Sequence, residues 1–511
     1  MDRGLGYWTG KRALISGEKT AIVCHDYSFS YLELHQRCCQ LAHWLRDNGI
    51  RKGDRVSGLL LNSHQFIELF FACAKLGAVF VPVNIRLTSP EIQYILADAA
   101  PSITFYHDEF LSVVDDVREQ VECQRFLSCG AGFTGKNDQQ YEALFADLPA
   151  DDFDFNIDAD DLQMMLYTSG TTGRPKGAML SHRNTEWNAI QVCTRLPMSA
   201  TDKIIVVAPM FHAGGINVLT TPGLYLGCTL YIQQQFDPIN VLETIEQHKI
   251  NSMFGVPSMW QAVMQCLEKK EYDLSSLSFL MGGGAPCPLN MLRYFQDKDI
   301  PFLEGFGLTE TAPLVCVLDA KDSQRKNGYV GKAGFHVDVR VVDENGNTLA
   351  ADEVGELTCR GPNVFKGYWN QPEETRKALK NGWFHTGDLA FIDSEGFIKI
   401  VDRKKDMLIS GGENVYPAEV EQTIYDHPAV AQVAVIGIPH ETWQEVPCAI
   451  IVLNDESTAT EAEIMDFCEQ RLARFKTPKK VVFIEEMPIS GSGKMQKMEL
   501  RKRFGGITVA R

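Results

Sequence analysis

The residues best suited to chemistry lie in one stretch, YTSGTTGRPKGAML, at positions 167–180. Gly170 and Gly173 allow backbone conformations that other residues avoid. Around them lie hydroxyl side chains and one cation: Thr168, Ser169, Thr171, Thr172 and Lys176. Amides, hydroxyls and a positive charge gathered in one loop suit the binding of a polyphosphate.

This stretch is not a Walker A loop, which needs G-x-x-x-x-G-K followed by Ser or Thr. Lys176 follows a proline and precedes a glycine. A second stretch, GSGK at 491–494, also fails, because Pro488 occupies the place of the first glycine and Met495 follows the lysine. Alone, either stretch is compatible with a surface loop. The rest of the chain must decide between the two interpretations.

Five further motifs follow the first in a fixed order. They are MGGGAP at 281–286, EGFGLTET at 304–311, WFHTGDLA at 383–390, VDRKKDMLISGGENVYPAEVE at 401–421 and PISGSGKMQK at 488–497. Over nearly the whole chain this series resembles the adenylate-forming superfamily of acyl-CoA synthetases, firefly luciferases and peptide-synthetase adenylation domains. The resemblance implies an enzyme that uses ATP to make an acyl-AMP and then passes the acyl group to a thiol. It also implies Mg²⁺ and coenzyme A.

The resemblance assigns a nucleotide site. The loop from Thr168 to Lys176 is expected around the β- and γ-phosphates, Thr309 near the α-phosphate, and Thr168 and Glu310 at the metal. A carboxylate oxygen beside phosphates suits magnesium. The other nucleotide residues implied are Gly283, Gly284 and Ala285 around adenine, Phe306 and Gly307 against its ring, and Asp388 and Arg403 near the ribose. Phe306 stands where the family often has tyrosine, so stacking is retained without a phenolic hydroxyl.

The resemblance also implies a catalytic lysine and a hinge. Lys494 is expected to bridge the substrate carboxylate and the α-phosphate, and it joins Thr309, Glu310 and His212 in the expected catalytic set. Rotation at Lys405 would withdraw Lys494 and bring a glycine-containing loop to the same centre. The residues expected to bind coenzyme A are Ser410, Gly411, Gly412, Trp443, Arg474 and Lys476.

Alternation of helical and buried-strand patterns organises the chain. Segments such as ELHQRCCQLAHWLRDNG read as helices, and runs such as KIIVVAP read as buried strands. This alternation predicts an α/β fold with parallel, helix-wrapped sheets. The pattern changes between Asp402 and Asp406, which predicts a domain boundary there. The resemblance implies a large N-terminal domain over 1–402 and a small, mobile α+β C-terminal domain over 403–511.

Composition excludes several classes of protein. A net charge of −17 argues against a general nucleic-acid binder, although the last forty residues are basic. The most apolar segment, FIELFFACAKLGAVFVPV, is interrupted by Glu68 and Lys75, so no membrane span or export signal is expected. The 14 cysteines include no C-x-x-C pair, which favours reduced thiols in the cytoplasm. Oligomeric state is left open, with a homodimer among the options.

The absence of cationic side chains from the expected pocket narrows the class of substrate acid. The stretches PMFHAGGIN, MFGVPSMW, MGGGAP and LTETAP contain no Lys or Arg, so we expect a monocarboxylic acid with an apolar body. His212 is expected at the pocket mouth, and Gly214, Gly215 and Gly284 suggest open space. We favour a medium- or long-chain fatty acid, with a hydroxycinnamate or other aryl acid as the alternative. A stand-alone ligase that loads a carrier protein is a further option, whereas luciferase and a non-catalytic regulator are disfavoured.

Overall fold

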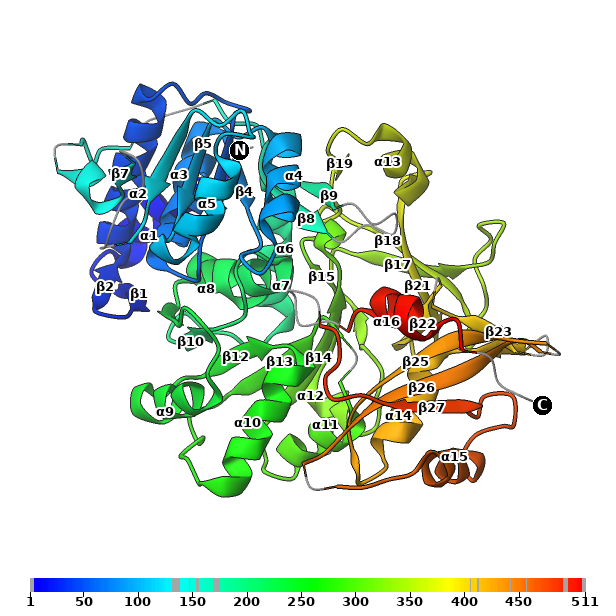
Figure 1. Cartoon of the computed structure of the whole chain (residues 1–511). Helices are drawn as coiled ribbons and strands as arrows, with labels where there is room; N and C mark the ends of the chain where they lie inside the picture. Colours follow the sequence, from blue (N-terminus) through cyan, green and yellow to red (C-terminus); the bar gives the residue numbers. More distant parts are fainter. Residues whose placement is uncertain are drawn as a thin grey trace.

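The computed structural model describes the chain except for residues 1–3, 131–137, 147, 153–155, 169–174, 286, 405, 411–412, 442, 456, 490–494 and 508–511. Four sheets organise it (Figure 1): two large, helix-covered sheets built mostly from the first 333 residues, a smaller antiparallel sheet formed by later residues, and a fourth sheet near the C-terminus. The predicted α/β class is therefore confirmed. No described helix combines the length and apolar character needed to cross a membrane.

The first large sheet has the strand order β19-β9-β8-β4-β3-β5-β6-β7. Its strands are β3 (Arg55–Leu59), β4 (Val79–Pro82), β5 (Ile103–Tyr106), β6 (Arg125–Ser128), β7 (Gln139–Gln140), β8 (Leu162–Thr168), β9 (Lys176–Ser181) and β19 (Gly367–Tyr368). Its neighbouring helices are α2 (Tyr31–Asp47), α3 (His64–Leu76), α4 (Ser89–Ala99), α5 (Leu111–Val117) and α6 (His182–Arg195). The central strands run parallel, and β9 turns back antiparallel to β8.

The second large sheet has the order β16-β15-β14-β13-β12-β10-β11-β1-β2. Its strands are β1 (Thr20–Cys24), β2 (Tyr27–Ser30), β10 (Lys203–Val206), β11 (Thr229–Ile232), β12 (Ser252–Gly255), β13 (Phe279–Gly283), β14 (Phe302–Gly307), β15 (Leu314–Leu318) and β16 (Lys332–Ala333). The helices around it are α1 (Tyr7–Ser16), α7 (Ala213–Gly215), α8 (Thr221–Leu226), α9 (Pro238–His248), α10 (Pro257–Lys269), α11 (Leu289–Gln296) and α12 (Ala320–Ser323). A single 3₁₀ turn, η4 (Thr309–Thr311), follows β14 directly.

The third sheet joins β17 (Asp338–Val342), β18 (Gly355–Arg360), β20 (Leu379–Lys380), β21 (Trp383–Ile392) and β22 (Ile398–Arg403), with α13 (Pro372–Ala378) beside it. The fourth joins β23 (Leu408–Ser410), β24 (Glu413–Val415), β25 (Val430–His440), β26 (Gln444–Leu453) and β27 (Lys480–Phe483). Its helices are α14 (Pro417–Tyr425), α15 (Glu461–Glu469) and α16 (Lys497–Phe504).

The fourth sheet has its own hydrophobic cores. On one face Val420 and Ile424 of α14 pack with Ile464 of α15, and on the other Leu500 of α16 packs against β25 and β26. Two cores around one antiparallel-dominated sheet describe a small α+β unit that buries its own apolar surface. Figure 1 shows this unit in orange and red, below the third sheet.

Candidate active site

The two ends of the phosphate-loop motif are fixed by strand pairing. Thr168 ends β8 and is the register partner of Lys176, which begins β9. The Thr168 hydroxyl donates a hydrogen bond of 3.5 Å to the carbonyl oxygen of Lys176. Residues 169–174 lie outside the described residues, so their expected phosphate contacts stay predictions. The described ends show that the loop leaves and re-enters one antiparallel pair.

Lys176 is a buried cation with a fixed counterion. Its side chain forms a hydrogen-bonded ion pair with Glu374 of α13, and its ammonium lies 5.4 Å from the ring centre of Tyr368. The bond from Lys176, followed by that from Lys377, lowers the pKa of Glu374 to about 2. Glu374 is therefore ionised at neutral pH. In this structure the charge of Lys176 is balanced within the protein.

Glu310, the carboxylate expected at the metal, lies in the 3₁₀ turn that directly follows β14. Glu310 is buried in η4, next to the half-buried Thr309. The Tyr368 hydroxyl donates a 2.8 Å hydrogen bond to Glu310 Oε1, and the amide of Phe365 donates 2.9 Å to the Glu310 carbonyl. A buried, hydrogen-bonded carboxylate is the hard oxygen ligand that Mg²⁺ prefers. The residues present therefore fit a magnesium ion.

The expected adenine wall consists of adjacent strand ends. Gly283 ends β13 and is the register partner of Gly305, beside the half-buried Phe306 on β14. At Gly307 a Cβ atom would lie 1.8 Å from the carbonyl oxygen of Pro313, so only glycine fits. Gly284 has a φ of +83°, which favours glycine. These glycines place no side chain between the strand ends and the phenyl ring, and their role in binding adenine stays a prediction.

The expected ribose residues form a cross-strand pair. Asp388 on β21 is the register partner of Arg403 on β22, and Arg403 Nε lies 2.6 Å from Asp388 Oδ1. The Asp388 side chain is only 3 % exposed, whereas that of Arg403 is 42 % exposed. The Asp388 amide donates to Thr386 Oγ1, whose own hydroxyl donates to the Leu357 carbonyl. These bonds fix the backbone of Asp388, its carboxylate contacts Arg403, and the guanidinium is partly exposed to solvent.

His212 lies at the start of α7, half-buried, with its ring 4.7 Å from that of Phe211. The glycines after it do not open space. A Cβ on Gly214 would lie 2.9 Å from the Phe254 ring, and one on Gly215 would lie 2.0 Å from the Pro209 carbonyl oxygen. Both glycines instead permit close packing, which corrects the expectation of an open floor. The cavity bounded by Gly215, Leu219 and Phe254 has a volume of about 10 Å³.

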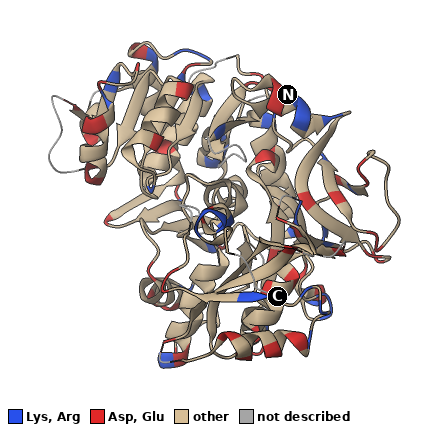
Figure 2. Ribbon diagram, turned by 45° about the vertical axis from the view of Figure 1, so that its right-hand side comes forward, with Lys and Arg blue, Asp and Glu red and all other residues tan. Residues whose placement is uncertain are grey.

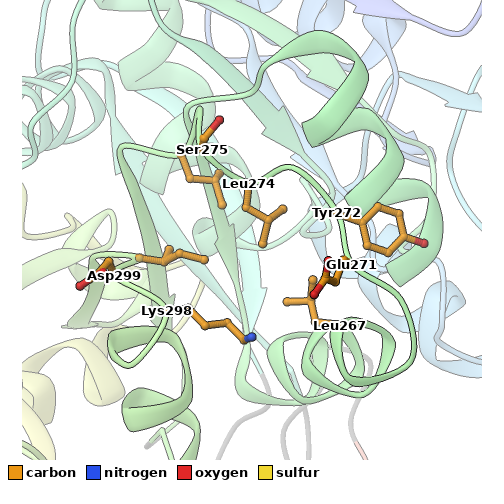
Figure 3. A pocket seen from close by; sticks show the side chains of 9 residues that line it. Leu267, Glu271, Tyr272, Leu274, Ser275, Lys298 and Asp299 are labelled. Atoms are coloured by element: carbon orange, nitrogen blue, oxygen red, sulfur yellow. The ribbon is translucent and has the colours of Figure 1, made fainter.

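A larger hollow of about 480 Å³ lies elsewhere, between the end of α10 and the segment after α11 (Figure 3). Its lining includes Leu267, Tyr272 and Lys298, and none of its residues belongs to the six motifs. We therefore do not place the active site there.

The residues expected to bind coenzyme A lie on the C-terminal unit. Lys476 pairs with Glu419 at 2.7 Å, Arg474 is exposed, and Lys479 lies 5.6 Å from the Trp443 ring centre. Ser410 is buried at the end of β23. Lys494, Lys405, Gly411 and Gly412 lie outside the described residues, so their roles stay predictions.

Charged residues occur on most elements of the molecule (Figure 2). At the basic end of the chain, Lys497 pairs with Glu421 and Arg501 pairs with Asp406, whereas Lys502 remains 71 % exposed. Part of this charge is therefore used to hold the C-terminal unit together.

Sequence reasoning missed three residues at the site: Tyr368, Glu374 and Glu304. Tyr368 and Glu374 meet Lys176 only because β19 pairs with β9, and no local spacing in the sequence indicates this pairing. Glu304 is different, because a charged residue inside the buried run FLEGFG is itself a signal. Burial raises the pKa of Glu304 to about 8, and a hydrogen bond from Cys287 opposes the shift. Among the described residues, its Oε2 atom has no hydrogen-bond partner.

Comparison with known families identifies the class. The AMP-binding enzyme family matches residues 11–369, and the AMP-binding enzyme C-terminal domain matches residues 419–494. The chain belongs to the AMP-binding enzymes of the adenylate-forming superfamily. It is an acid–thiol ligase that depends on ATP.

Individual relatives span both chains almost completely. The chain is 41 % identical over 504 residues to a feruloyl-CoA synthase of an Amycolatopsis species, covering 99 % of this chain and 100 % of that protein. It is 36 % identical over 504 residues to a long-chain-fatty-acid–CoA ligase of Mycobacterium tuberculosis, covering 98 % and 99 %.

Among solved structures, ATP-bound MatB from Rhodopseudomonas palustris gives a TM-score of 0.91 at 32 % identity, covering 99 % of each chain. Apo MatB from the same organism gives a TM-score of 0.80 at 31 % identity, with the same coverage.

Proposed function

We propose that the protein activates a monocarboxylic acid with a flat aryl body, of the hydroxycinnamate class, and transfers it to coenzyme A. The first support is the greater identity to the feruloyl-CoA synthase than to the long-chain ligase, 41 % against 36 %, at nearly equal coverage. This reverses the preference for a fatty acid that the sequence suggested.

The packing of Phe254 carries this choice of substrate. Its ring lies between two glycines of the expected pocket, 2.9 Å from a Cβ position on Gly214 and 3.3 Å from one on Gly283. The cavity beside it, about 10 Å³ in volume, holds neither an alkyl chain nor an aryl ring as it stands, so Phe254 must move for either acid. For an aryl acid the displaced ring still offers aromatic contact in addition to apolar burial, whereas for a long alkyl chain it is only an obstruction.

A fatty acid is the second candidate, because the long-chain ligase aligns over 98 % of this chain. The two candidates make opposite demands on Phe254: an alkyl substrate needs a smaller side chain there, and an aryl substrate uses the ring.

The first half-reaction joins two anions, so the site must gather positive charge and aimed donors. In the proposal the phosphate loop holds the β- and γ-phosphates, and Asp388 accepts from the ribose hydroxyls while Arg403 contacts the nucleotide. A magnesium ion held by Glu310 and Thr168 would neutralise phosphate charge. Lys494 orients the substrate carboxylate against the α-phosphorus. Attack by the carboxylate oxygen breaks the bond to pyrophosphate and leaves acyl-AMP.

In the second half-reaction the thiol sulfur of coenzyme A forms the thioester bond and AMP departs. We propose that the C-terminal unit rotates between the two steps about a hinge near Lys405, which separates domains 1–402 and 403–511. The third sheet ends at Arg403 and the fourth begins at Leu408. The higher TM-score to ATP-bound than to apo MatB supports an arrangement suited to the first step.

The decisive experiment is pyrophosphate release by purified protein with ATP, Mg²⁺ and a panel of acids from acetate through palmitate to coumarate and ferulate. Each acid is assayed with and without coenzyme A. Turnover with coumarate or ferulate that depends on coenzyme A supports the proposal. Turnover with palmitate alone rejects it in favour of the second candidate. Release without thioester points to a carrier protein as acceptor.

Two variants locate the pocket. Phe254→Ala is expected to move the preference from aryl toward alkyl acids, because it removes the ring and opens its volume. His212→Ala is expected to change the KM for the acid more than that for ATP. An effect of His212→Ala confined to ATP contradicts its place at the pocket mouth.

A further inference from the structure

Tyr368 occupies a position that the fold determines closely. It lies on β19, which adds to the edge of the first sheet so that Tyr368 is the register partner of Ala178, two residues beyond the start of β9. Its amide donates a 2.9 Å hydrogen bond to Thr375 Oγ1. The preceding Gly367 has a φ of +127°, and a Cβ there would lie 2.5 Å from Thr375. The tyrosine is thus anchored beside the strand that leaves the phosphate loop.

The hydroxyl of Tyr368 reaches the expected metal-binding carboxylate. It donates 2.8 Å to Glu310 Oε1, across 58 positions of sequence. A phenol is a neutral hydrogen-bond donor at physiological pH. With Oε1 engaged in this way, the orientation of the carboxylate is fixed, while its second oxygen can still face a cation.

The aromatic ring of Tyr368 makes a second contact, with the side chain of Lys176. The Lys176 ammonium lies 5.4 Å from the ring centre and is paired with Glu374 on α13. A cation over an aromatic face is attracted by the electron-rich ring. Ring and hydroxyl together connect the base of the phosphate loop to Glu310.

From these contacts we infer that Tyr368 is a positioning residue for the metal site: its hydroxyl holds the Glu310 carboxylate in the orientation that receives the cation of the metal–nucleotide complex. This inference rests on the proposed function only in taking Glu310 as a metal ligand. A carboxylate fixed before the cation arrives avoids losing side-chain freedom on binding, so removal of the hydroxyl weakens metal binding more than nucleotide binding.

The test is Tyr368→Phe, which keeps the ring under Lys176 and removes only the oxygen. Mn²⁺ is titrated by electron paramagnetic resonance into protein saturated with the non-hydrolysable α,β-methylene analogue of ATP. AMP binding without metal is measured in parallel by calorimetry. We expect the Mn²⁺ dissociation constant to rise about tenfold, the usual effect of one hydrogen bond to a charged group, and AMP binding to change less than about twofold.

The matched control is Tyr329→Phe, which removes a phenolic oxygen from a tyrosine that packs against Phe391 away from the site. It is expected to leave both constants unchanged. In a Glu310→Gln background, Tyr368→Phe is expected to add almost nothing, because its route to the metal is already lost. Unchanged Mn²⁺ binding in Tyr368→Phe overturns the inference, and so does an equal loss of Mn²⁺ and AMP binding, which indicates a general structural role.

The outcome is separable from that of the proposed function. If the acid panel gives no turnover but Tyr368→Phe selectively weakens Mn²⁺ binding, the inference stands and the proposed reaction fails. If the panel succeeds and Mn²⁺ binding is unaffected, the reverse holds.

Discussion

The residues expected to bind the nucleotide and those expected to bind coenzyme A differ in how their charged side chains are held. We call these two sets the nucleotide side and the thiol side. At the nucleotide side, expected ligands contact one another or share partners: Arg403 meets Asp388 at 2.6 Å, and Tyr368 reaches Glu310 at 2.8 Å. On the C-terminal unit, Lys476 pairs at 2.7 Å with Glu419 of α14, an element of the same small unit.

The difference teaches that the two halves of the reaction are prepared differently. The expected nucleotide residues belong to three sheets, yet the described ones already contact partners, and such preorganisation lowers the cost of binding a highly charged ligand. The residues expected to bind coenzyme A contact partners within the C-terminal unit, and in the proposed function they reach the site by movement of that unit. Substitutions can break or sharpen this contrast.

The largest effect is expected at Lys494. Lys494→Ala should slow acyl-AMP formation by about a hundredfold or more, because it removes a cation aimed at the reacting phosphate. Thioester formation from supplied acyl-AMP should remain largely intact. Pyrophosphate release and thioester formation are measured separately, with exposed Lys502→Ala as control. Equal loss of both half-reactions would contradict the division of labour.

A buried acid on the nucleotide side should make stability depend on pH. The pKa of Glu304 is raised from 4.5 to about 8, so between these values the unfolded chain loses a proton that the folded chain keeps. Stability from this group is therefore full below pH 4.5 and falls as pH rises to about 8.

The substitution Glu304→Gln removes this loss of stability at higher pH, because glutamine does not ionise. Relative to wild type, the free energy of unfolding should move in the variant's favour by up to about 5 kcal/mol between acidic and mildly alkaline pH. Thermal unfolding at the two pH values measures it, with exposed Glu271→Gln as control. A constant difference between variant and wild type at both pH values would show that Glu304 is ionised in the folded protein.

The ribose pair offers a matched comparison within one sheet. Asp388→Asn should raise the KM for ATP about tenfold by weakening a charge-assisted hydrogen bond. Asp338→Asn alters a similar cross-strand pair, because Asp338 lies 2.8 Å from Arg360 on the same sheet but is exposed. Asp338→Asn should change this KM little. Similar changes in both variants would remove the special role of Asp388.

The hinge is expected to give an intermediate effect. Lys405→Pro restricts backbone rotation and should slow thioester formation about fivefold, with less effect on acyl-AMP formation. Lys405→Ala removes the charge without restricting φ and serves as control. If proline and alanine have the same effect, the side chain matters and the rotation does not.

The smallest effect is expected on the thiol side. Lys476→Ala should raise the KM for coenzyme A only about twofold, since a partly exposed cation already paired with Glu419 contributes little. Lys480→Ala, which breaks a similar pair with Glu461 at 2.9 Å, is the control. A tenfold change for Lys476 would mean that the thiol side is as well prepared as the nucleotide side.

The α/β class could be predicted from the alternating patterns. The nucleotide roles of Asp388, Arg403, Glu310 and Phe306 stay predictions; the structure places Asp388 opposite Arg403 across β21 and β22, Phe306 on β14 and Glu310 in the turn after it. The local position of each residue is accessible from sequence because each motif contains its own strand or turn.

The long-range strand pairing could not be predicted from the sequence. Lys176 and Glu374 are separated by 198 positions, and they meet only because the two-residue β19 joins the edge of the first sheet. Gly214 was misread for a related reason. A glycine signals either space or close approach, and only the position of the Phe254 ring distinguishes them.

The short connection between Arg403 and Leu408 has a mechanical consequence. Four residues separate the third sheet from the fourth, and fully extended they span about 14 Å. The C-terminal unit is therefore on a short tether, and its local concentration at the nucleotide side stays high in every orientation. In the proposed rotation near Lys405 the two sets of residues exchange places without drifting apart, so the enzyme would replace a search through solution with a turn about one point.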